Sequence, residues 1–318
     1  MIDNISRALP NTNCGKNTQV RCLLHIFNLV TKATVSPFTT LSKKEDPGDV
    51  DEEEEEEAGM EDQEDSAEAD NGDDDPNATL PPGSVDPLRD IEDDIMLENI
   101  VEEMLALLEE RDIEAFEVPE EQFAMARSTF RKSRRLGKKV HYSTPLKEEL
   151  KEVCERFAIT YKTLKKLVSS RWNSLHTMWD SFQHLHDALD ELCDPSPRRG
   201  ARVPKISKDR KLLKKWKLTD GEWHLVESII PLLEQFIFAA QHMQTNKRPL
   251  LFQVIEKMDT LNEILEEWVR DTSKPAVIRF GAAKGLTVLD KYYAKTDDSI
   301  MYRAAMSSPS SGLQNILF

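Results

Sequence analysis

Apolar residues recur at helical spacing along most of the chain, most clearly over residues 174–189. Apolar side chains three and four positions apart there form one face of about four helical turns. The positions on this face are Leu175, Met178, Trp179, Phe182, Leu185 and Leu189. Such a face must be buried, so the pattern predicts an amphipathic helix that begins after a cap at Asn173 or Ser174.

The same periodicity predicts further helices, and the chain is therefore expected to be mainly α. They span residues 20–35, 91–108, 120–135, 146–157, 208–216, 219–243, 251–268 and 277–293. Pro37 is expected to end the first helix, Pro231 to kink the helix at 219–243, and Thr219 or Asp220 to cap it. One short strand is predicted at 164–168, where a partly β-branched run precedes two serines.

Charge divides the chain into an acidic arm and a basic body. The net charge is -16, but residues 45–76 hold 19 acidic and no basic residues, which leaves the remainder at -16 + 19 = +3. At this density like charges repel, and little apolar area offsets the entropy of ordering, so residues 45–85 are predicted to be a disordered acidic insertion. It is either a solvated loop or an arm that binds basic partners such as histones.

The basic body is consistent with phosphate binding. Residues 122–318 contain 34 Lys and Arg against 23 Asp and Glu, a net of 34 - 23 = +11. Six cations fall within nine positions: Arg131, Lys132, Arg134, Arg135, Lys138 and Lys139. This cluster suits DNA phosphates or nuclear import. The alternative is a solvated helix end whose cations complement the helix dipole.

Metal and membrane chemistry are not indicated. The four cysteines are widely spaced without a CxxC pair, which favours a reduced intracellular protein over a disulfide scaffold. Cys22 and His25 lie one turn apart, but zinc needs about four ligands and no second pair has matching spacing. The most apolar run, residues 228–243, is shorter than the roughly 20 residues that span a bilayer. The start of the chain lacks the apolar core of a signal peptide. We expect a soluble protein with no cofactor and no membrane partner.

Arg171 and Trp172 lie at the predicted corner between the strand and the helix at 174–189. A side chain at such a corner can project from the end of a sheet instead of packing inside it. A flat aromatic beside a cation is suited to contact a nucleobase or a phosphate. The alternative is a core tryptophan beside a solvated arginine.

Several motifs resemble hAT-superfamily DNA transposases. They are DNIS at 3–6, RCLLHIFNLV at 21–30, HYSTPLKEELKEVCERF at 141–157, RWNS at 171–174, WHLVESIIPLLEQF at 223–236 and LDKYYAKTDDSIMYRAAM at 289–306. The resemblance covers residues 1–44 and about 120–305. It implies a ribonuclease-H-like α/β core that a helical insertion interrupts. It also implies that Trp172 stacks on a base at the cleaved transposon end.

In this family three carboxylates hold two magnesium ions for strand cleavage, and Asp3 matches the second of them. The first acid is expected upstream of Asp3 and the third after the helical insertion, yet no glutamate follows Glu267. The family also carries an Asp shortly before the Arg-Trp pair, where this chain has Leu167 or Val168. One acid of three predicts no catalytic activity, and magnesium is expected only if the full triad were restored.

The resemblance thus implies a partial ribonuclease-H-like core interrupted by an acidic disordered insertion and followed by a long-helix bundle. The expected parts are a core fragment (1–44), the acidic insertion (45–85), the remainder of the core with the RWNS corner (86–192), the helical insertion (193–305) and a disordered tail (306–318). The expected function is a nuclear, transposase-derived DNA-binding protein that uses Arg171, Trp172 and the basic cluster. The alternative is a helical protein-interaction module whose acidic arm binds basic partners.

Overall fold

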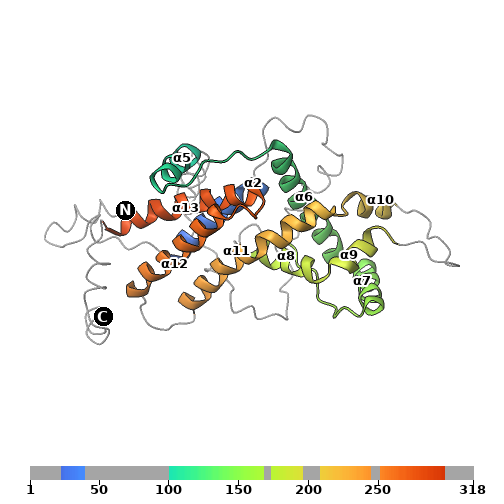
Figure 1. The fold of residues 1–318 in the computed structure, drawn as a ribbon. Helices are drawn as coiled ribbons and strands as arrows, with labels where there is room; N and C mark the ends of the chain where they lie inside the picture. Colours follow the sequence, from blue (N-terminus) through green and yellow to red (C-terminus); the bar gives the residue numbers. More distant parts are fainter. Residues whose placement is uncertain (1–22, 40–99, 168–172, 196–207, 245–250, 298–318) are drawn as a thin grey trace, which may run out of the picture.

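The computed structural model describes residues 23–39, 100–167, 173–195, 208–244 and 251–297. Their regular secondary structure is entirely α-helical (Figure 1), so the prediction of a mainly α protein is confirmed. The helices are α2 (Leu23–Thr39), α5 (Ile100–Glu110), α6 (Glu120–Tyr142), α7 (Thr144–Phe157), α8 (Ser174–His184), α9 (His186–Cys193), α10 (Lys208–Lys215), α11 (Asp220–Gln244), α12 (Leu251–Arg270) and α13 (Ala276–Asp297). None of these helices is both long enough and apolar enough to cross a bilayer.

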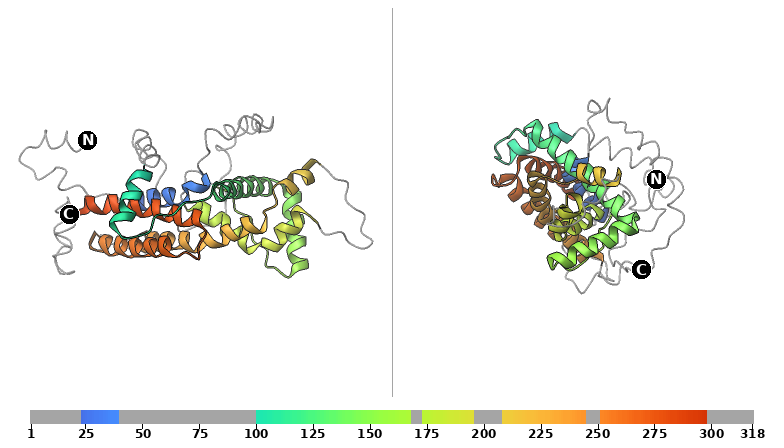
Figure 2. Two further views of the ribbon diagram at one scale, coloured as in Figure 1. Left: turned by 45° about the horizontal axis from the view of Figure 1, so that its top comes forward. Right: turned by 90° about the vertical axis from the view of Figure 1, so that its right-hand side faces the viewer.

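The helices form an elongated bundle (Figures 1 and 2). Helices α2, α5, α12 and α13 lie toward one end, and α7, α8, α9 and α10 lie toward the other. Helix α11 runs between the two groups and packs against α6 and α8 on one side and α2, α12 and α13 on the other. A continuous apolar core therefore runs through both ends.

Helix α2 lies at the centre of the bundle, in contact with α13, α6 and α11. Lys32 and Thr39 are its only exposed residues. Pro37 lies within its last turn and does not end it. Proline has no backbone N–H to donate to the carbonyl of Ala33, and the Ser36 hydroxyl donates to that oxygen instead, at 2.8 Å. The helix ends at Thr39, two residues beyond Pro37 and four beyond the predicted range, so the prediction that Pro37 ends it is wrong.

Helices α2 and α13 cross with glycine at the contact. A Cβ atom on Gly281 would overlap with the backbone oxygen of Thr34, and one on Gly285 would overlap with the Thr34 hydroxyl. Because neither glycine has a side chain, the two helix backbones can approach closely here. Beside this crossing, the Lys284 ammonium donates to Ser36 Oγ at 2.7 Å.

The helix predicted at 174–189 has the expected buried face but is divided at Leu185. Its six predicted core residues are all buried. Leu185 has φ -102° and ψ 13°, and its N–H donates to the carbonyls of Ser181 and Phe182. Trp179 packs edge-on against Phe38 of α2 with 5.3 Å between ring centroids. The predicted burial is confirmed, whereas the predicted continuity is wrong.

The predicted strand is replaced by an extended segment without strand pairing. Residues 161–167 have no regular secondary structure, and residue 168 lies outside the described ranges. Leu164 is buried, and the Lys165 N–H donates to the side-chain oxygen of Ser181 at 3.2 Å rather than to a neighbouring strand. The apolar run packs against helices, so within the described ranges there is no sheet for it to join.

Candidate nucleic-acid interface

Helix α6 carries the basic cluster on the side away from the core. Its buried residues face α2, α8 and α11: Ala126, Thr129, Ser133, Leu136, Gly137 and Val140. Arg131 and Arg134 are exposed, while Arg135, Lys138 and Lys139 are half-buried. Positions 131, 134 and 138 follow helical spacing, so these cations form one stripe along the helix. Residues 131–142 contain no carboxylate.

Lys132 differs from the rest of the cluster because its charge is directed into the fold. Its ammonium lies 2.8 Å from Glu222 Oε2, and the Glu222 side chain is nearly fully buried. Ser128 Oγ donates to the other carboxylate oxygen at 2.7 Å. Lys132 therefore joins α6 to the start of α11, and its assignment as a DNA contact stays a prediction.

Glu222 also completes a capping box at the start of α11. The Thr219 N–H donates to Glu222 Oε2 at 2.8 Å, and the Glu222 N–H donates to Thr219 Oγ1 at 3.3 Å. This pairing selects Thr219 over Asp220 as the cap. Burial raises the pKa of Glu222, but hydrogen bonds from Lys132, Ser128 and Thr219, with the charge of Lys132, outweigh it and lower the pKa below its ordinary value.

An exposed tyrosine ends the basic stripe. Tyr142 is the last residue of α6 and is 54% exposed. The Lys166 ammonium contacts its hydroxyl and lies 4.7 Å from the ring centroid. The His141 ring lies perpendicular to the Tyr142 ring, with 5.0 Å between centroids. The end of α6 thus combines an aromatic ring with nearby cations. The sequence analysis did not single out Tyr142, although an aromatic residue shortly after a basic run is a signal that could have identified it.

Three predicted site residues, Asp3, Arg171 and Trp172, lie outside the described ranges. The chain on either side of residues 168–172 nevertheless packs against the basic half of α6. A Cβ on Gly137 would lie 3.4 Å from the Lys165 carbonyl oxygen on one side and 3.6 Å from the Phe182 ring of α8 on the other. These contacts reach α6 on its core-facing side, and the segment before residue 168 also reaches the end of the basic stripe, where Lys166 contacts Tyr142.

Among the residues that the structure describes, no three or more His, Cys, Asp or Glu side chains form a cluster that could hold a metal ion. Cys22 lies outside the described ranges, so the Cys22 and His25 pair cannot be placed. Cys154 and Cys193 are buried, and burial raises the pKa of the Cys154 thiol, which disfavours its metal-binding thiolate form.

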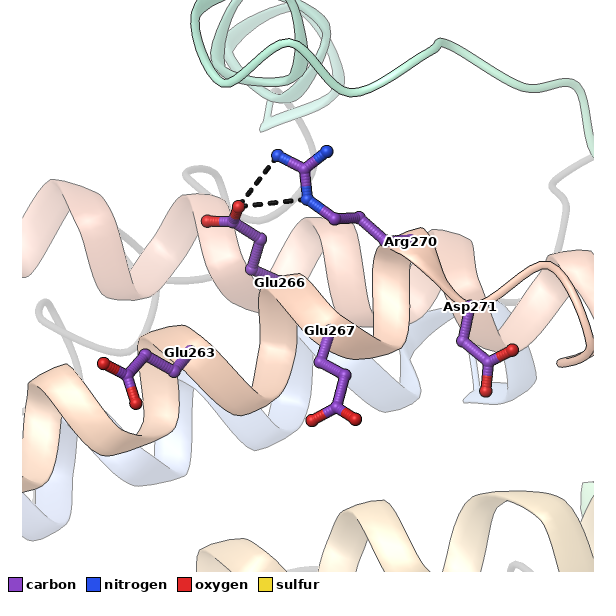
Figure 3. A pocket seen from close by; sticks show the side chains of 5 residues that line it. All are labelled: Glu263, Glu266, Glu267, Arg270 and Asp271. Atoms are coloured by element: carbon purple, nitrogen blue, oxygen red, sulfur yellow. Dashed lines mark hydrogen bonds and ion pairs between the residues drawn. The ribbon is translucent and has the colours of Figure 1, made fainter.

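A shallow hollow lies at the end of α12, where four of its five lining residues are acidic: Glu263, Glu266, Glu267, Arg270 and Asp271. Figure 3 shows Glu266 and Arg270 turned toward one another, while Glu267 and Asp271 point away from that pair. Arg270 Nη2 lies 2.9 Å from Glu266 Oε1. The acidic lining makes this hollow unsuitable for phosphate.

The pair in the hollow belongs to a network that holds the end of α5. Arg111 donates to Glu266 of α12 and to Asp290 of α13, both at 2.8 Å, and Arg270 donates to the Arg111 carbonyl at 2.7 Å. Burial raises the pKa of Glu266, but hydrogen bonds from Arg270 and Arg111, with their charges, outweigh it and lower the pKa. Arg111, Arg270, Glu266 and Asp290 therefore form a structural clamp that joins the end of α5 to α12 and α13.

No protein-family model, curated protein or solved structure matches this chain. The resemblance to hAT transposases therefore rests on the quoted sequence motifs. The candidate interface rests separately on the basic stripe of α6 and on the segments that pack beside it.

Proposed function

We propose that the protein binds DNA through the solvent-facing side of α6 and that it derives from an hAT-type transposase. The observation that carries this proposal is the run of cations without a carboxylate at residues 131–142, on a helix whose opposite face is fixed in the core. Because that face is packed, the cations project from a rigid support. Rigid cationic surfaces neutralise backbone phosphates and release their counterions.

The dimensions of the stripe suit one strand of DNA. Arg131 and Lys138 are seven residues apart, which corresponds to about 10 Å along a helix. With about 3.4 Å of axial rise per nucleotide on one strand, this length spans roughly three phosphates. Arg131 and Arg134 are the exposed members of the stripe, and they supply the main phosphate contacts in this proposal.

The transposase derivation is supported by the sequence motifs, among them RWNS at 171–174. Lys165, before residue 168, and Phe182, after residue 172, both lie against Gly137 of α6. Arg171 and Trp172, the residues of the RWNS corner, fall between these two positions in the sequence and lie outside the described ranges. In this proposal they extend the DNA-binding surface, with a ribonuclease-H-like core as the ancestral fold and the nucleus as the site of action.

The test is a binding titration of labelled duplex DNA at several salt concentrations. The variant Arg131→Gln/Arg134→Gln removes the two exposed cations of the stripe. The control Lys257→Gln/Lys295→Gln removes the same charge near the start of α12 and the end of α13, at the other end of the bundle (Figure 1). We expect the affinity of the unsubstituted protein to fall with salt. The stripe variant should bind about tenfold more weakly, with the slope of log affinity against log salt reduced by about 2.

Two results would contradict this proposal. One is failure of the unsubstituted protein to bind any DNA, duplex or single-stranded, at about 50 mM salt, where phosphate contacts are strongest. The other is an equal loss of affinity in the stripe variant and the control variant, because binding would then depend on overall charge and not on α6.

A further inference from the structure

We propose that Tyr142 is a base-stacking platform and that this surface accepts unpaired nucleotides of single-stranded DNA. The inference rests on the proposed DNA binding and specifies which form of DNA the site takes. It is carried by three observations on the end of α6: the exposure of the ring, the contacts that orient it and the cations beside it.

The exposure of Tyr142 distinguishes it from most aromatic residues of this protein. Within the described ranges, Tyr142, Phe157 and Phe238 are the exposed aromatic side chains, and Tyr142 is the one that ends the basic stripe. Its phenol ring adds little to the core, because 54% of the residue is accessible. An aromatic ring that follows a row of phosphate-binding cations is placed to meet the base of the same strand.

The neighbours of Tyr142 hold the ring in place. Lys166 contacts the hydroxyl from the segment that precedes the RWNS corner, and its ammonium lies 4.7 Å from the ring centroid. His141 packs perpendicular to the ring from the preceding position in α6. A ring that is already oriented loses less conformational entropy when a base stacks on it.

The Lys166 ammonium also supplies charge next to the ring. A nucleotide that stacks on Tyr142 would place its phosphate within reach of a cation from a different segment than α6. Helix α7 follows directly and has no acidic residue in its first turn, so no carboxylate there repels that phosphate. The corner between α6 and α7 thus offers a stacking surface and positive charge together.

The preference for unpaired nucleotides follows from the geometry of nucleic acids. In a duplex, base faces are covered by the neighbouring base pairs, and a protein side chain reaches base edges through the grooves. An aromatic ring at the end of a helix can stack on a base only when that base is unstacked. Cations alone would bind single-stranded and duplex DNA alike, so in this proposal the Tyr142 ring is the group that favours single-stranded DNA over duplex DNA.

The experiment compares three probes of about 15 nucleotides, a length that fits the site sizes of single-strand binding surfaces. They are a thymidine oligomer, an abasic oligomer with the same backbone and a blunt duplex. The variants are Tyr142→Ala and Tyr142→Phe, with Phe238→Ala as the control, because Phe238 is 60% exposed on α11. Thermal unfolding of each variant establishes that the fold is retained.

We expect Tyr142→Ala to weaken binding of the thymidine oligomer about tenfold and to change binding of the duplex and the abasic oligomer by less than about twofold. Tyr142→Phe should retain the affinity within about threefold, because the ring remains. Phe238→Ala should bind all three probes as the unsubstituted protein does.

An equal loss for all three probes in Tyr142→Ala would overturn the stacking role. So would a Tyr142→Phe variant as weak as Tyr142→Ala, or salt-sensitive DNA binding that Tyr142→Ala does not alter. The last result would leave the proposed DNA binding intact. Absence of binding to every probe would overturn both proposals.

Discussion

The Lys284 ammonium of α13 donates a 2.7 Å hydrogen bond to the Ser36 hydroxyl of α2. Lys284 is only 9% exposed, and burial lowers its pKa from the ordinary value of 10.5. The same hydroxyl donates to the Ala33 carbonyl, which Pro37 leaves without a helical N–H. The Ser36 hydroxyl thus accepts a hydrogen bond from the buried Lys284 ammonium and donates one to the carbonyl that Pro37 leaves without its helical donor.

Replacing Lys284 with Met is expected to stabilise the protein by about 1 kcal/mol at neutral pH, because it removes a buried charge but keeps an unbranched side chain. Between the lowered pKa and 10.5 the unfolded chain binds more protons than the folded one, so stability rises with pH there. The advantage of Lys284→Met is therefore full below the folded pKa and shrinks as pH rises toward 10.5. Urea unfolding from pH 7 to alkaline pH measures it. An advantage independent of pH would contradict this explanation.

The close crossing of α2 and α13 predicts that alanine at either glycine destabilises the protein, and that Thr34→Ala restores stability to only one of the two variants. Gly285→Ala should cost about 1–3 kcal/mol by overpacking against the Thr34 hydroxyl, and Thr34→Ala in the same chain should recover part of that loss. Gly281→Ala should be equally harmful but not rescued, because the overlapping atom is the backbone oxygen of Thr34. Urea unfolding of the single and double variants measures both effects.

Gly221→Ala is the matched control for this pair. Its Cβ would meet the Met125 sulfur at 3.0 Å, and this flexible side chain can move away. The change should therefore shift the free energy of unfolding by less than about 0.5 kcal/mol. If Thr34→Ala restored stability to both α13 variants to the same degree, the result would contradict the explanation that Gly281→Ala overlaps with the Thr34 backbone.

Glu222 is expected to stabilise the junction of α6 and α11 in a pH-dependent way. Its lowered pKa means that the folded state favours the carboxylate, so the stability it contributes is present above the ordinary pKa of 4.5 and is lost as pH falls through the folded pKa. Glu222→Gln should cost about 1–3 kcal/mol at pH 7 and progressively less below 4.5. Guanidinium unfolding at pH 7 and in acid measures the difference. A constant cost at both values would exclude a role for the charge.

Arg111 is expected to hold α5 against the rest of the bundle. Arg111→Gln removes its ion pairs to Glu266 and Asp290, and should cost about 1–2 kcal/mol and speed amide hydrogen exchange in α5. The control is Lys214→Gln, which removes an exposed pair with Asp194 and should change stability by less than about 0.5 kcal/mol. Unchanged exchange in α5 would count against the clamp.

The acidic arm provides the test of the alternative function. Residues 45–85 carry 19 carboxylates, and we expect this negative charge to compete with DNA for the basic stripe of α6 or to repel the DNA. Deleting them should raise DNA affinity at low salt. The protein-interaction reading instead predicts loss of binding to basic partners such as histones, measured by titration with core histones. Loss of DNA binding on deletion would contradict the first expectation, and unchanged histone binding would contradict the second.

The periodicity of apolar residues was sufficient to locate the helices, because a long amphipathic pattern has few alternative structures. The predicted strand and the continuity of the helix at 174–189 were wrong, because both depend on contacts that periodicity does not report. The run at 164–168 was too short to distinguish a strand from an extended segment, and its backbone found a serine side chain instead of a neighbouring strand. The break at Leu185 left no signal, since that residue continues the apolar face.

The candidate site was predictable as a charge cluster but not in its details. Sequence alone could not separate Lys132 from Arg131, because the partner that binds Lys132 lies 90 residues away in α11. The pairing of Lys166 with Tyr142 depends on how the segment after α7 folds back onto α6. Such contacts between distant segments are set by packing and not by local pattern.

The central position of α2 has a consequence for synthesis of the chain. This helix precedes the other described helices in the chain, and α13, its main packing partner, begins 276 - 39 = 237 residues after α2 ends. At about 5–20 residues per second, the face of α2 that α13 covers stays exposed on the nascent chain for roughly 10–50 s. During that time this apolar face is open to aggregation, although α6 and α11 are already available to cover other parts of the helix.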